Sequence, residues 1–263
     1  MVGGEENSLV VFRNVSVYRG STLALDRIDL RIEQGEHLAI LGPNGSGKST
    51  LVKAIFQECY PLATDDSHFS VFGRQRWNLA ELRSKLGVVS NDPGLFGSRP
   101  ITGLEAVLSG FFSSIGLWPH LEVSPWMRHR AEDVLHLLEA GHLADRCVSE
   151  MSSGEARRIL VARALVHDPC TLVFDEPSNS LDLFAQDELR QIMRHLAGKG
   201  ITILLVTHHL PDIIPEIKRV IFVKGGKITQ DGPKDHLLTA SHLRELFQVD
   251  LEVTTRNQFY HAW

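Results

Sequence analysis

The sequence has little of what a secreted or membrane-spanning protein needs. Only three of its 263 residues are cysteines, and they lie far apart, without the spacing of a metal site. We therefore expect reduced, structural cysteines and a cytoplasmic protein. No stretch approaches the roughly 18 uninterrupted apolar residues of a membrane span, and the acidic N-terminus does not resemble a signal peptide. Any part that crosses a membrane is thus expected to come from another chain.

An excess of basic charge is lacking as well. The 27 Lys and Arg residues are outnumbered by 32 Asp and Glu residues, which gives a net charge of −5. A protein that binds nucleic acid through its overall field is normally basic, so we do not expect a nucleic-acid partner. The remaining composition, 43% apolar and 22% charged, is typical of a soluble globular protein. The length allows one large domain or two small ones.

Short apolar runs alternate with helical stretches along most of the chain. This alternation predicts a parallel α/β sheet with both faces covered, and the Gly225–Gly226 pair predicts a hairpin near the end. From about 92 to 150 the character changes to long helical stretches, so we predict a helical segment inserted into one α/β domain. A helix and a short strand-like end are expected after about Leu237. The predicted strands are 9–20, 25–36, 37–42, 85–90, 171–176 and 200–209.

The stretch "GPNGSGKS" (42–49) fits the P-loop pattern G-x-x-x-x-G-K-[ST]. It follows a predicted strand and opens a predicted helix, which is the context the motif requires. Glycines let backbone N–H groups surround phosphate oxygens, Lys48 adds charge toward the β- and γ-phosphates, and the Ser49 hydroxyl binds Mg²⁺. The alternative is a glycine-rich turn that binds nothing, in which Lys48 and Ser49 have no purpose. The predicted ATP-binding residues here are Gly42, Pro43, Asn44, Gly45, Ser46, Gly47, Lys48, Ser49 and Thr50.

Two more predicted strands end in polar side chains suited to phosphate chemistry. In "TLVFDEP", Asp175 is expected to help hold Mg²⁺ and Glu176 to act as the general base that orients the attacking water. The alternative is that either acid only caps the following helix. His208 ends the apolar run "TILLVTH", where ligands of α/β sheets bind, and we expect it to contact the γ-phosphate.

A fourth motif has two interpretations that do not exclude one another. In "MSSGEARR", Ser152 and Glu155 have the spacing of a capping box at the start of a helix. A helix N-terminus opened by serines and a glycine can also hold an anion. The residues alone leave open whether this stretch is a cap, a phosphate site, or both.

Together, "GPNGSGKST", "MSSGEARR", "TLVFDEP", "SNSLD" and "VTHH" resemble, in order, the motifs of the ATP-binding cassette (ABC) ATPase family. The resemblance covers roughly Val10 to Gly232. It implies a P-loop core with an antiparallel β subdomain and an inserted helical subdomain. The expected domain is 9–240, with the helical subdomain at about 92–150 and a C-terminal extension at 241–263.

The resemblance also assigns roles to further residues. Tyr18 matches the aromatic residue that stacks on adenine, although an aromatic side chain in a strand can equally pack in the core. Asp182 matches a contact between protomers, although it can also cap a helix. The residues Ser152, Ser153, Gly154 and Glu155 match the signature, which in the family binds the γ-phosphate of ATP held by the partner's P-loop.

Two positions depart from the family pattern. Ser153 replaces the first signature glycine, and Glu155 replaces a glutamine. A carboxylate beside a phosphate weakens the site unless its charge turns toward the helix cap. Asn91 stands where the family has a glutamine that touches Mg²⁺. It is one methylene shorter, and its alternative role is that of a turn residue before Asp92-Pro93.

These features predict an ATPase that closes as a dimer, with a second copy of the chain as the expected partner, around two ATP and two Mg²⁺. The resemblance favours the energy subunit of a transporter, on the cytoplasmic face of a membrane and beside separate membrane subunits. The alternatives are a soluble cassette acting on a cytosolic or nucleic-acid target, and a regulatory binder that scarcely hydrolyses ATP. Glu176 and His208 argue against the binder.

Overall fold

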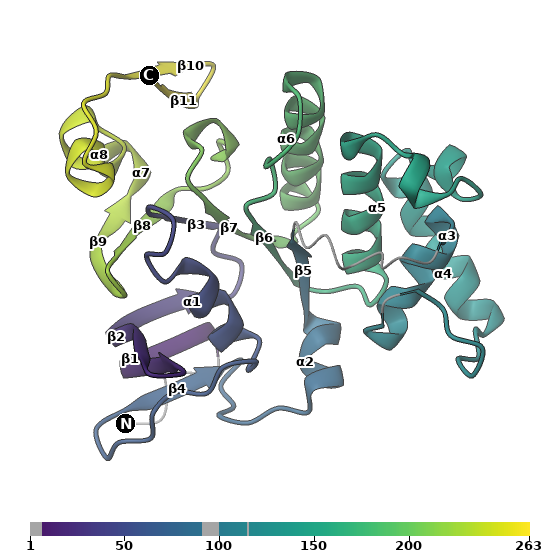
Figure 1. The fold of residues 1–263 in the computed structure, drawn as a ribbon, viewed down its shortest axis with the longest axis horizontal. Coiled ribbons are helices and arrows are strands. Elements are labelled where there is room, and N and C mark those ends of the chain that lie inside the picture. The colour runs from purple at the N-terminus through teal and green to yellow at the C-terminus, as the bar shows by residue number, and fades with distance from the viewer. Residues whose placement is uncertain (1–6, 91–99, 115) are drawn as a thin grey trace. The chain divides into compact units, whose positions relative to one another are not determined.

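The computed structural model describes residues 7–90, 100–114 and 116–263. It contains two compact units, and each is described by itself (Figure 1). The first unit combines Met1–Leu82 with Thr202–Trp263, and the second is Arg83–Ile201. Helix α2 (Leu79–Lys85) carries the chain from the first unit into the second.

The first unit contains most of the strands and the P-loop. Its strands are β1 (Ser8–Arg19), β2 (Thr22–Glu33), β3 (Leu38–Leu41), β4 (His68–Val71), β7 (Thr202–Thr207), β8 (Arg219–Lys224), β9 (Lys227–Pro233), β10 (Val253–Arg256) and β11 (Phe259–Ala262). Its helices are α1 (Lys48–Ile55), the 3-10 turn η5 (Leu210–Asp212), α7 (Lys234–Leu237) and α8 (Ala240–Phe247).

A parallel layer forms the core of the first unit. Strand β3 pairs in parallel with β7 on one side and with β8 on the other, and Leu38 lies opposite both Leu204 and Arg219. Every residue of β3 and β7 is buried, as expected for parallel strands with both faces covered. Strand β9 returns antiparallel to β8 through Gly225 and Gly226, so the predicted hairpin is confirmed.

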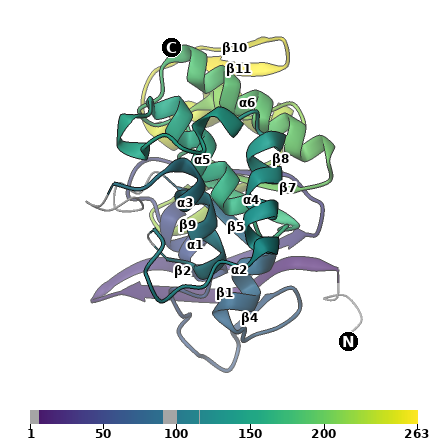
Figure 2. The same ribbon diagram turned by 90° about the vertical axis from the view of Figure 1, so that its right-hand side faces the viewer.

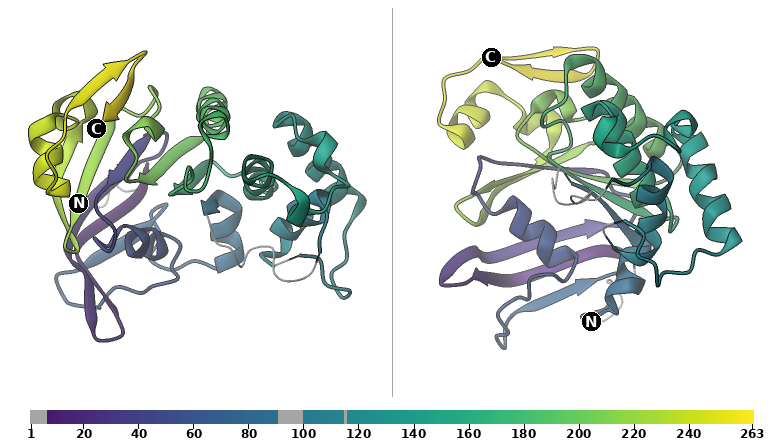
Figure 3. Two further views of the ribbon diagram at one scale, coloured as in Figure 1. Left: turned by 45° about the horizontal axis from the view of Figure 1, so that its top comes forward. Right: turned by 45° about the vertical axis from the view of Figure 1, so that its right-hand side comes forward.

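A separate antiparallel sheet has the order β2-β1-β4. Strand β1 pairs with β2 over almost its whole length, and its first half pairs with β4. Helix α1 packs on β1 and β2 of this sheet (Figure 3). The helix that begins at the P-loop is thus supported by strands from the start of the chain.

The chain ends in a small hairpin of β10 and β11. Strand β11 packs against η5, the segment that follows β7. The Tyr260 hydroxyl donates a hydrogen bond to Asp235 Oδ1 at 2.5 Å. Burial, and then this bond, raise the pKa of Tyr260 to about 12. The hairpin is therefore attached through a side chain that stays protonated up to high pH.

The second unit is largely helical. Strands β5 (Leu86–Ser90) and β6 (Thr171–Asp175) pair in parallel, and Ser90 lies opposite Asp175. Helix α5 packs on β5 and contacts α3, α4 and α6, and Figure 2 shows α3, α4 and α5 side by side. The helices are α3 (Gly103–Leu108), η2 (Ser109–Phe112), α4 (Pro125–Leu137), η3 (Gly141–Leu143), η4 (Val148–Glu150), α5 (Ser153–Leu165) and α6 (Leu183–Gly198).

The α/β class and the six predicted strands are confirmed, although most observed strands are a few residues shorter or longer than predicted. The tail also follows the prediction, since helix α8 precedes two short strands. Among the described residues, no helix is both long and apolar enough to cross a membrane. The predicted domain ranges stay predictions.

Candidate functional site

The P-loop joins the buried strand β3 to helix α1, and its backbone requires glycine at two places. Gly47, the residue before α1, has φ +112°, a left-handed conformation that other residues rarely adopt. A Cβ at Gly47 lies only 2.9 Å from the Ala24 carbonyl oxygen, and a Cβ at Gly42 lies 2.1 Å from that of Val223. The loop is therefore a closely packed backbone cradle of the kind that surrounds a phosphate group.

Lys48 begins helix α1 and is only 5% exposed. Its ammonium group donates hydrogen bonds to the carbonyl oxygens of Gly42, at 2.7 Å, and Pro43, at 3.1 Å. The charge is thus held over the loop and beside the N-terminus of α1, where the helix dipole also favours an anion. The remaining predicted residues of the loop divide into exposed Asn44, Gly45 and Ser49, buried Ser46 and Thr50, and half-buried Pro43.

Tyr18 lies near the end of β1 and is 50% exposed. The interpretation of Tyr18 as a core aromatic residue is therefore wrong. Half of its side chain surface is open to a flat ligand such as adenine, and the stacking role stays a prediction.

His208 follows the last residue of β7, as its place in the sequence predicts. The backbone after it is held by Thr207, whose hydroxyl donates to Asp212 Oδ2 at 3.0 Å and accepts from His209 N–H at 2.9 Å. The ring centroid of His209 lies 4.0 Å from that of His208. The exposed His209 ring therefore covers one side of the half-buried His208 ring.

In the second unit, Asp175 ends β6 and Glu176 follows it directly. Both side chains are half-buried. Glu176 has φ +48°, which is uncommon for any residue with a Cβ and typical of strained positions at functional sites. Neither residue caps α6, since that helix begins after Asp182. The helix-cap alternative for these two acids is therefore wrong.

The predicted Mg²⁺ contact Asn91 lies outside the described residues. Its assignment as a metal contact or as a turn residue stays open.

Helix α5 begins at the signature, and the capping box is confirmed. The Ser152 hydroxyl accepts the N–H of Glu155 at 3.2 Å, and Glu155 Oε2 accepts the N–H of Ser152 at 2.8 Å. The other oxygen, Oε1, lies 2.5 Å from Arg146 Nη1. The Ser152 N–H and then Arg146 lower the pKa of Glu155. The carboxylate is therefore turned toward the cap and toward a cation.

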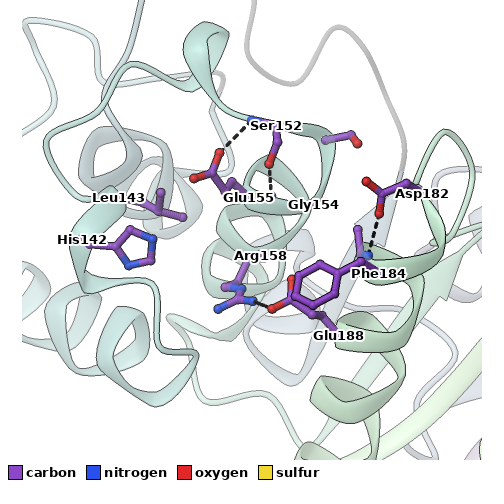
Figure 4. Close-up of a pocket in the computed structure, with 11 residues that line it drawn as sticks. His142, Leu143, Ser152, Gly154, Glu155, Arg158, Asp182, Phe184 and Glu188 are labelled. Atoms are coloured by element: carbon purple, nitrogen blue, oxygen red, sulfur yellow. Dashed lines mark hydrogen bonds and ion pairs between the residues drawn. The ribbon is translucent and has the colours of Figure 1, made fainter.

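The signature lines a pocket of about 330 Å³ in the second unit (Figure 4). Ser152 and Ser153 are exposed at its edge, and Gly154 packs so closely that an added Cβ lies 2.8 Å from Ala185 Cβ. Asp182 lines the same pocket and caps α6 by accepting the Ala185 N–H at 2.8 Å. Its role as a cap is confirmed, and its contact with a second protomer stays a prediction.

Phe184 and Arg146 are among the residues of this site that the sequence did not predict. Phe184 lines the pocket while 73% exposed, but one apolar residue in a helix carries no signal of its own. Arg146 lies nine residues before Glu155 in a segment without helical periodicity. No spacing rule connects the two, so only the folded chain pairs them.

Comparison with known proteins supports one family. The family model described as "ABC transporter" matches residues 25–179, more than half of the chain. The hemin import ATP-binding protein HmuV of Hahella chejuensis is 32% identical over 91% of this chain and 92% of its own length. The glutamine transport ATP-binding protein GlnQ of Escherichia coli is 33% identical over 91% of this chain and 99% of its own length.

Solved structures agree with these relatives. An ATP-binding cassette of an ABC transporter in its ADP conformation matches with a TM-score of 0.78 and 25% identity, over 92% of this chain and 98% of that one. A dimeric cassette in a post-hydrolysis state, bound to ADP and phosphate, matches with a TM-score of 0.68 and 27% identity. That match covers 85% of this chain and 98% of the other.

Proposed function

This chain belongs to the ABC transporter family of ATP-binding cassettes and is an ATPase, and we propose that it energises an importer whose membrane subunits are separate chains. Relatives across most of its length carry import in their names, among them the hemin import protein and a glutamate/aspartate import ATP-binding protein of Escherichia coli. The proposed place of work is the cytoplasmic face of a membrane.

The observation that carries the mechanism is the signature pocket at the start of α5. The chain has one P-loop, at the start of α1. The start of α5 is a second helix N-terminus suited to a phosphate group, and the exposed residues Ser152 and Ser153 lie at the edge of its pocket. In the proposed dimer of two copies, each signature completes the site at the partner's P-loop. Two ATP molecules are then enclosed, and their hydrolysis reopens the dimer.

Each step of ATP binding and hydrolysis has a proposed residue. Lys48 and the N–H groups of the P-loop bind the β- and γ-phosphates. Glu176 orients and polarises the attacking water, and His208 contacts the γ-phosphate. Tyr18 stacks on adenine.

The donor set also suits Mg²⁺. Ser49 offers an exposed hydroxyl in the first turn of α1, and Asp175 offers a carboxylate at the end of β6. Oxygen ligands of this kind are those that Mg²⁺ prefers, usually with several waters retained. When bound, the ion neutralises charge on the β- and γ-phosphates.

Replacing Glu176 tests the enzymatic proposal. Glu176→Gln removes the base while keeping the size of the side chain. We expect turnover to fall at least ~100-fold while ATP binding persists, the size expected for loss of a general base. Glu132→Gln is the matched control, since it removes a carboxylate on α4 of the same unit, outside β6 and outside the lining of the signature pocket. Turnover equal to wild type in Glu176→Gln excludes the general-base role.

Co-purification tests the transport proposal. The Glu176→Gln protein, expected to be trapped with ATP, is isolated from gentle detergent extracts of its own cells and the accompanying chains are identified. Integral membrane chains in a fixed ratio support the importer. If the only companions are cytosolic proteins or nucleic acid, the importer proposal is wrong and the soluble cassette is the better interpretation.

A further inference from the structure

Glu155 places a negative charge in the first turn of the helix that is proposed to meet the partner's ATP. The signature pocket holds two more carboxylates, those of Asp182 and Glu188. Three acids around a pocket oppose the approach of a triphosphate, because like charges at short range raise the free energy of binding. A phosphate site here requires that these charges be balanced.

Each of the three carboxylates has a partner. Asp182 accepts the N–H of Ala185 and caps α6, and Glu188 Oε1 lies 2.5 Å from Arg158 Nη2 (Figure 4). Glu155 is held on one side by the Ser152 N–H and on the other by Arg146. Arg146 thus supplies the cation closest to the carboxylate at the start of α5.

Arg146 is fixed in this position by more than one contact. Its Nη2 donates to the Glu150 carbonyl oxygen at 3.1 Å, and its own carbonyl oxygen accepts the N–H of Gly103 at 2.9 Å. Its side chain is 42% exposed and that of Glu155 is 29% exposed. An ion pair this exposed contributes little to the free energy of folding. Its main effect is therefore on the charge that a ligand meets at the start of α5.

A second capping box in the same unit provides the contrast. At α3, Glu105 Oε2 accepts the Thr102 N–H at 2.8 Å, and the Thr102 hydroxyl accepts the Glu105 N–H at 3.2 Å. These distances equal those at Ser152 and Glu155. A glutamate therefore caps a helix equally well without being placed at the signature, and the cap alone does not explain Arg146.

We propose that Arg146 is a positioning residue for ATP hydrolysis. It neutralises Glu155 and holds its carboxylate at the helix cap, so that the start of α5 accepts the γ-phosphate of ATP bound by a second copy of the chain. The inference rests on the proposed function of the signature.

The test measures ATP-dependent dimerisation by light scattering in the Glu176→Gln protein. Arg146→Met removes the charge and retains most of the length of the side chain. The ATP concentration for half-dimerisation should rise about tenfold, the order expected for one unit charge near a phosphate at a protein surface. Added salt should shrink this defect because it screens the exposed carboxylate.

Removing the second charge should rescue the first variant. A glutamine can keep the capping box, so Arg146→Met with Glu155→Gln should dimerise within about twofold of the parent. Arg146→Lys, which keeps the charge, should be intermediate. As matched controls, Glu105→Gln should not rescue Arg146→Met, and Arg130→Met should leave dimerisation unchanged. Arg130 bridges Asp168 and two carbonyl oxygens in the same unit, as Arg146 bridges Glu155 and Glu150.

Two results overturn this inference while leaving the proposed function intact. In the first, Arg146→Met dimerises like its parent. In the second, the double variant dimerises as weakly as Arg146→Met, which shows that Arg146 acts only by holding the Glu150 carbonyl oxygen. Failure of the proposed function looks different. In that case Ser153→Asp, which puts a carboxylate at the pocket edge and suits a helix start, leaves dimerisation unchanged, and the inference falls with it. Binding of ATP to monomers monitors the P-loop in every variant.

Discussion

Helices α1 and α5 both begin where we propose that a phosphate binds, and their first turns are built in opposite ways. Within the described residues, no side chain caps α1, its first turn has no acid, and the buried Lys48 adds positive charge. Helix α5 has a serine cap, a glutamate in its first turn and an arginine that balances it. One start is left open for a ligand, and the other is already satisfied by its own chain.

The difference in capping matches the different stages at which the two helices are proposed to bind phosphate. The P-loop binds ATP in a single protomer, so the uncapped N–H groups at the start of α1 can be satisfied by the ligand whenever ATP is present. In the proposed dimer, the signature meets ATP only when a second copy arrives. A helix that must stay folded between these encounters needs its own cap, and the capping box of Ser152 and Glu155 provides it.

The largest expected effect comes from separating the two helix starts onto different chains. Lys48→Ala damages α1, and Ser153→Asp damages the proposed phosphate site at α5 while favouring the helix dipole. Each variant alone should lose ATPase activity at least about 100-fold. Mixed in equal amounts, they should recover up to about one quarter of the wild-type rate, because half of random dimers are mixed and each has one intact site.

The control for Ser153→Asp is Ala240→Asp, which adds the same charge at the first position of α8 and should keep full activity. A signature that acts only as a cap within its own chain permits no recovery on mixing. Because strict coupling between two sites also suppresses recovery, dimerisation of the Glu176→Gln protein is measured in parallel. If mixing gives no recovery and Ser153→Asp leaves dimerisation unchanged, the start of α5 does not bind a partner's ATP. The contrast drawn between α1 and α5 as phosphate sites is then wrong.

A smaller effect should distinguish the start of α1, which has no side-chain cap, from the capped start of α5. Gly47→Ala puts a Cβ 2.9 Å from the Ala24 carbonyl oxygen at φ +112°. It should lower the free energy of unfolding by about 1–3 kcal/mol and abolish ATP binding. Ser152→Ala removes a cap and should cost about 1 kcal/mol, with ATP binding by the monomer retained. Chemical denaturation and ATP titration check both variants. Retained ATP binding in Gly47→Ala contradicts the role given to the P-loop backbone.

Motifs that combine a short apolar strand with fixed polar spacing were readable from the sequence. The P-loop, the strand ending at Asp175 and the capping box at Ser152 all occur where they were expected, because each depends on neighbours along the chain. The α/β class followed from the same alternation. These features need no knowledge of distant contacts.

The features that sequence missed depend on residues that only folding brings together. Arg146 meets Glu155 from an irregular segment, and Tyr260 meets Asp235 across 25 positions. The exposure of Tyr18 was ambiguous because alternating strand residues face opposite sides, and local sequence does not say which side is covered. Charge balance and exposure are tertiary properties, so motif spacing predicts the positions of the site but not its electrostatics.

The smallest expected effect concerns the charge at the start of α5. The pKa of Glu155 lies below its ordinary value of 4.5, because the Ser152 N–H and Arg146 favour the carboxylate. A lowered pKa in the folded state stabilises the protein above the ordinary pKa, and this contribution is lost as the pH falls through the folded value. Glu155→Gln keeps the cap and removes the titration, so it should be slightly less stable than wild type near neutral pH.

The advantage of wild type over Glu155→Gln should therefore shrink as the pH is lowered from about 7 to about 4 and beyond. Thermal unfolding of both proteins across this range measures the difference, and high salt should reduce it at neutral pH by screening Arg146. In the Arg146→Met background the same substitution should have a smaller effect on stability, because part of the favourable interaction is already gone. A difference that grows as the pH falls contradicts the assigned direction, and one that is unchanged in the Arg146→Met background shows that the backbone cap alone holds the carboxylate. In that case the two helix starts differ in hydrogen bonding but not in charge balance.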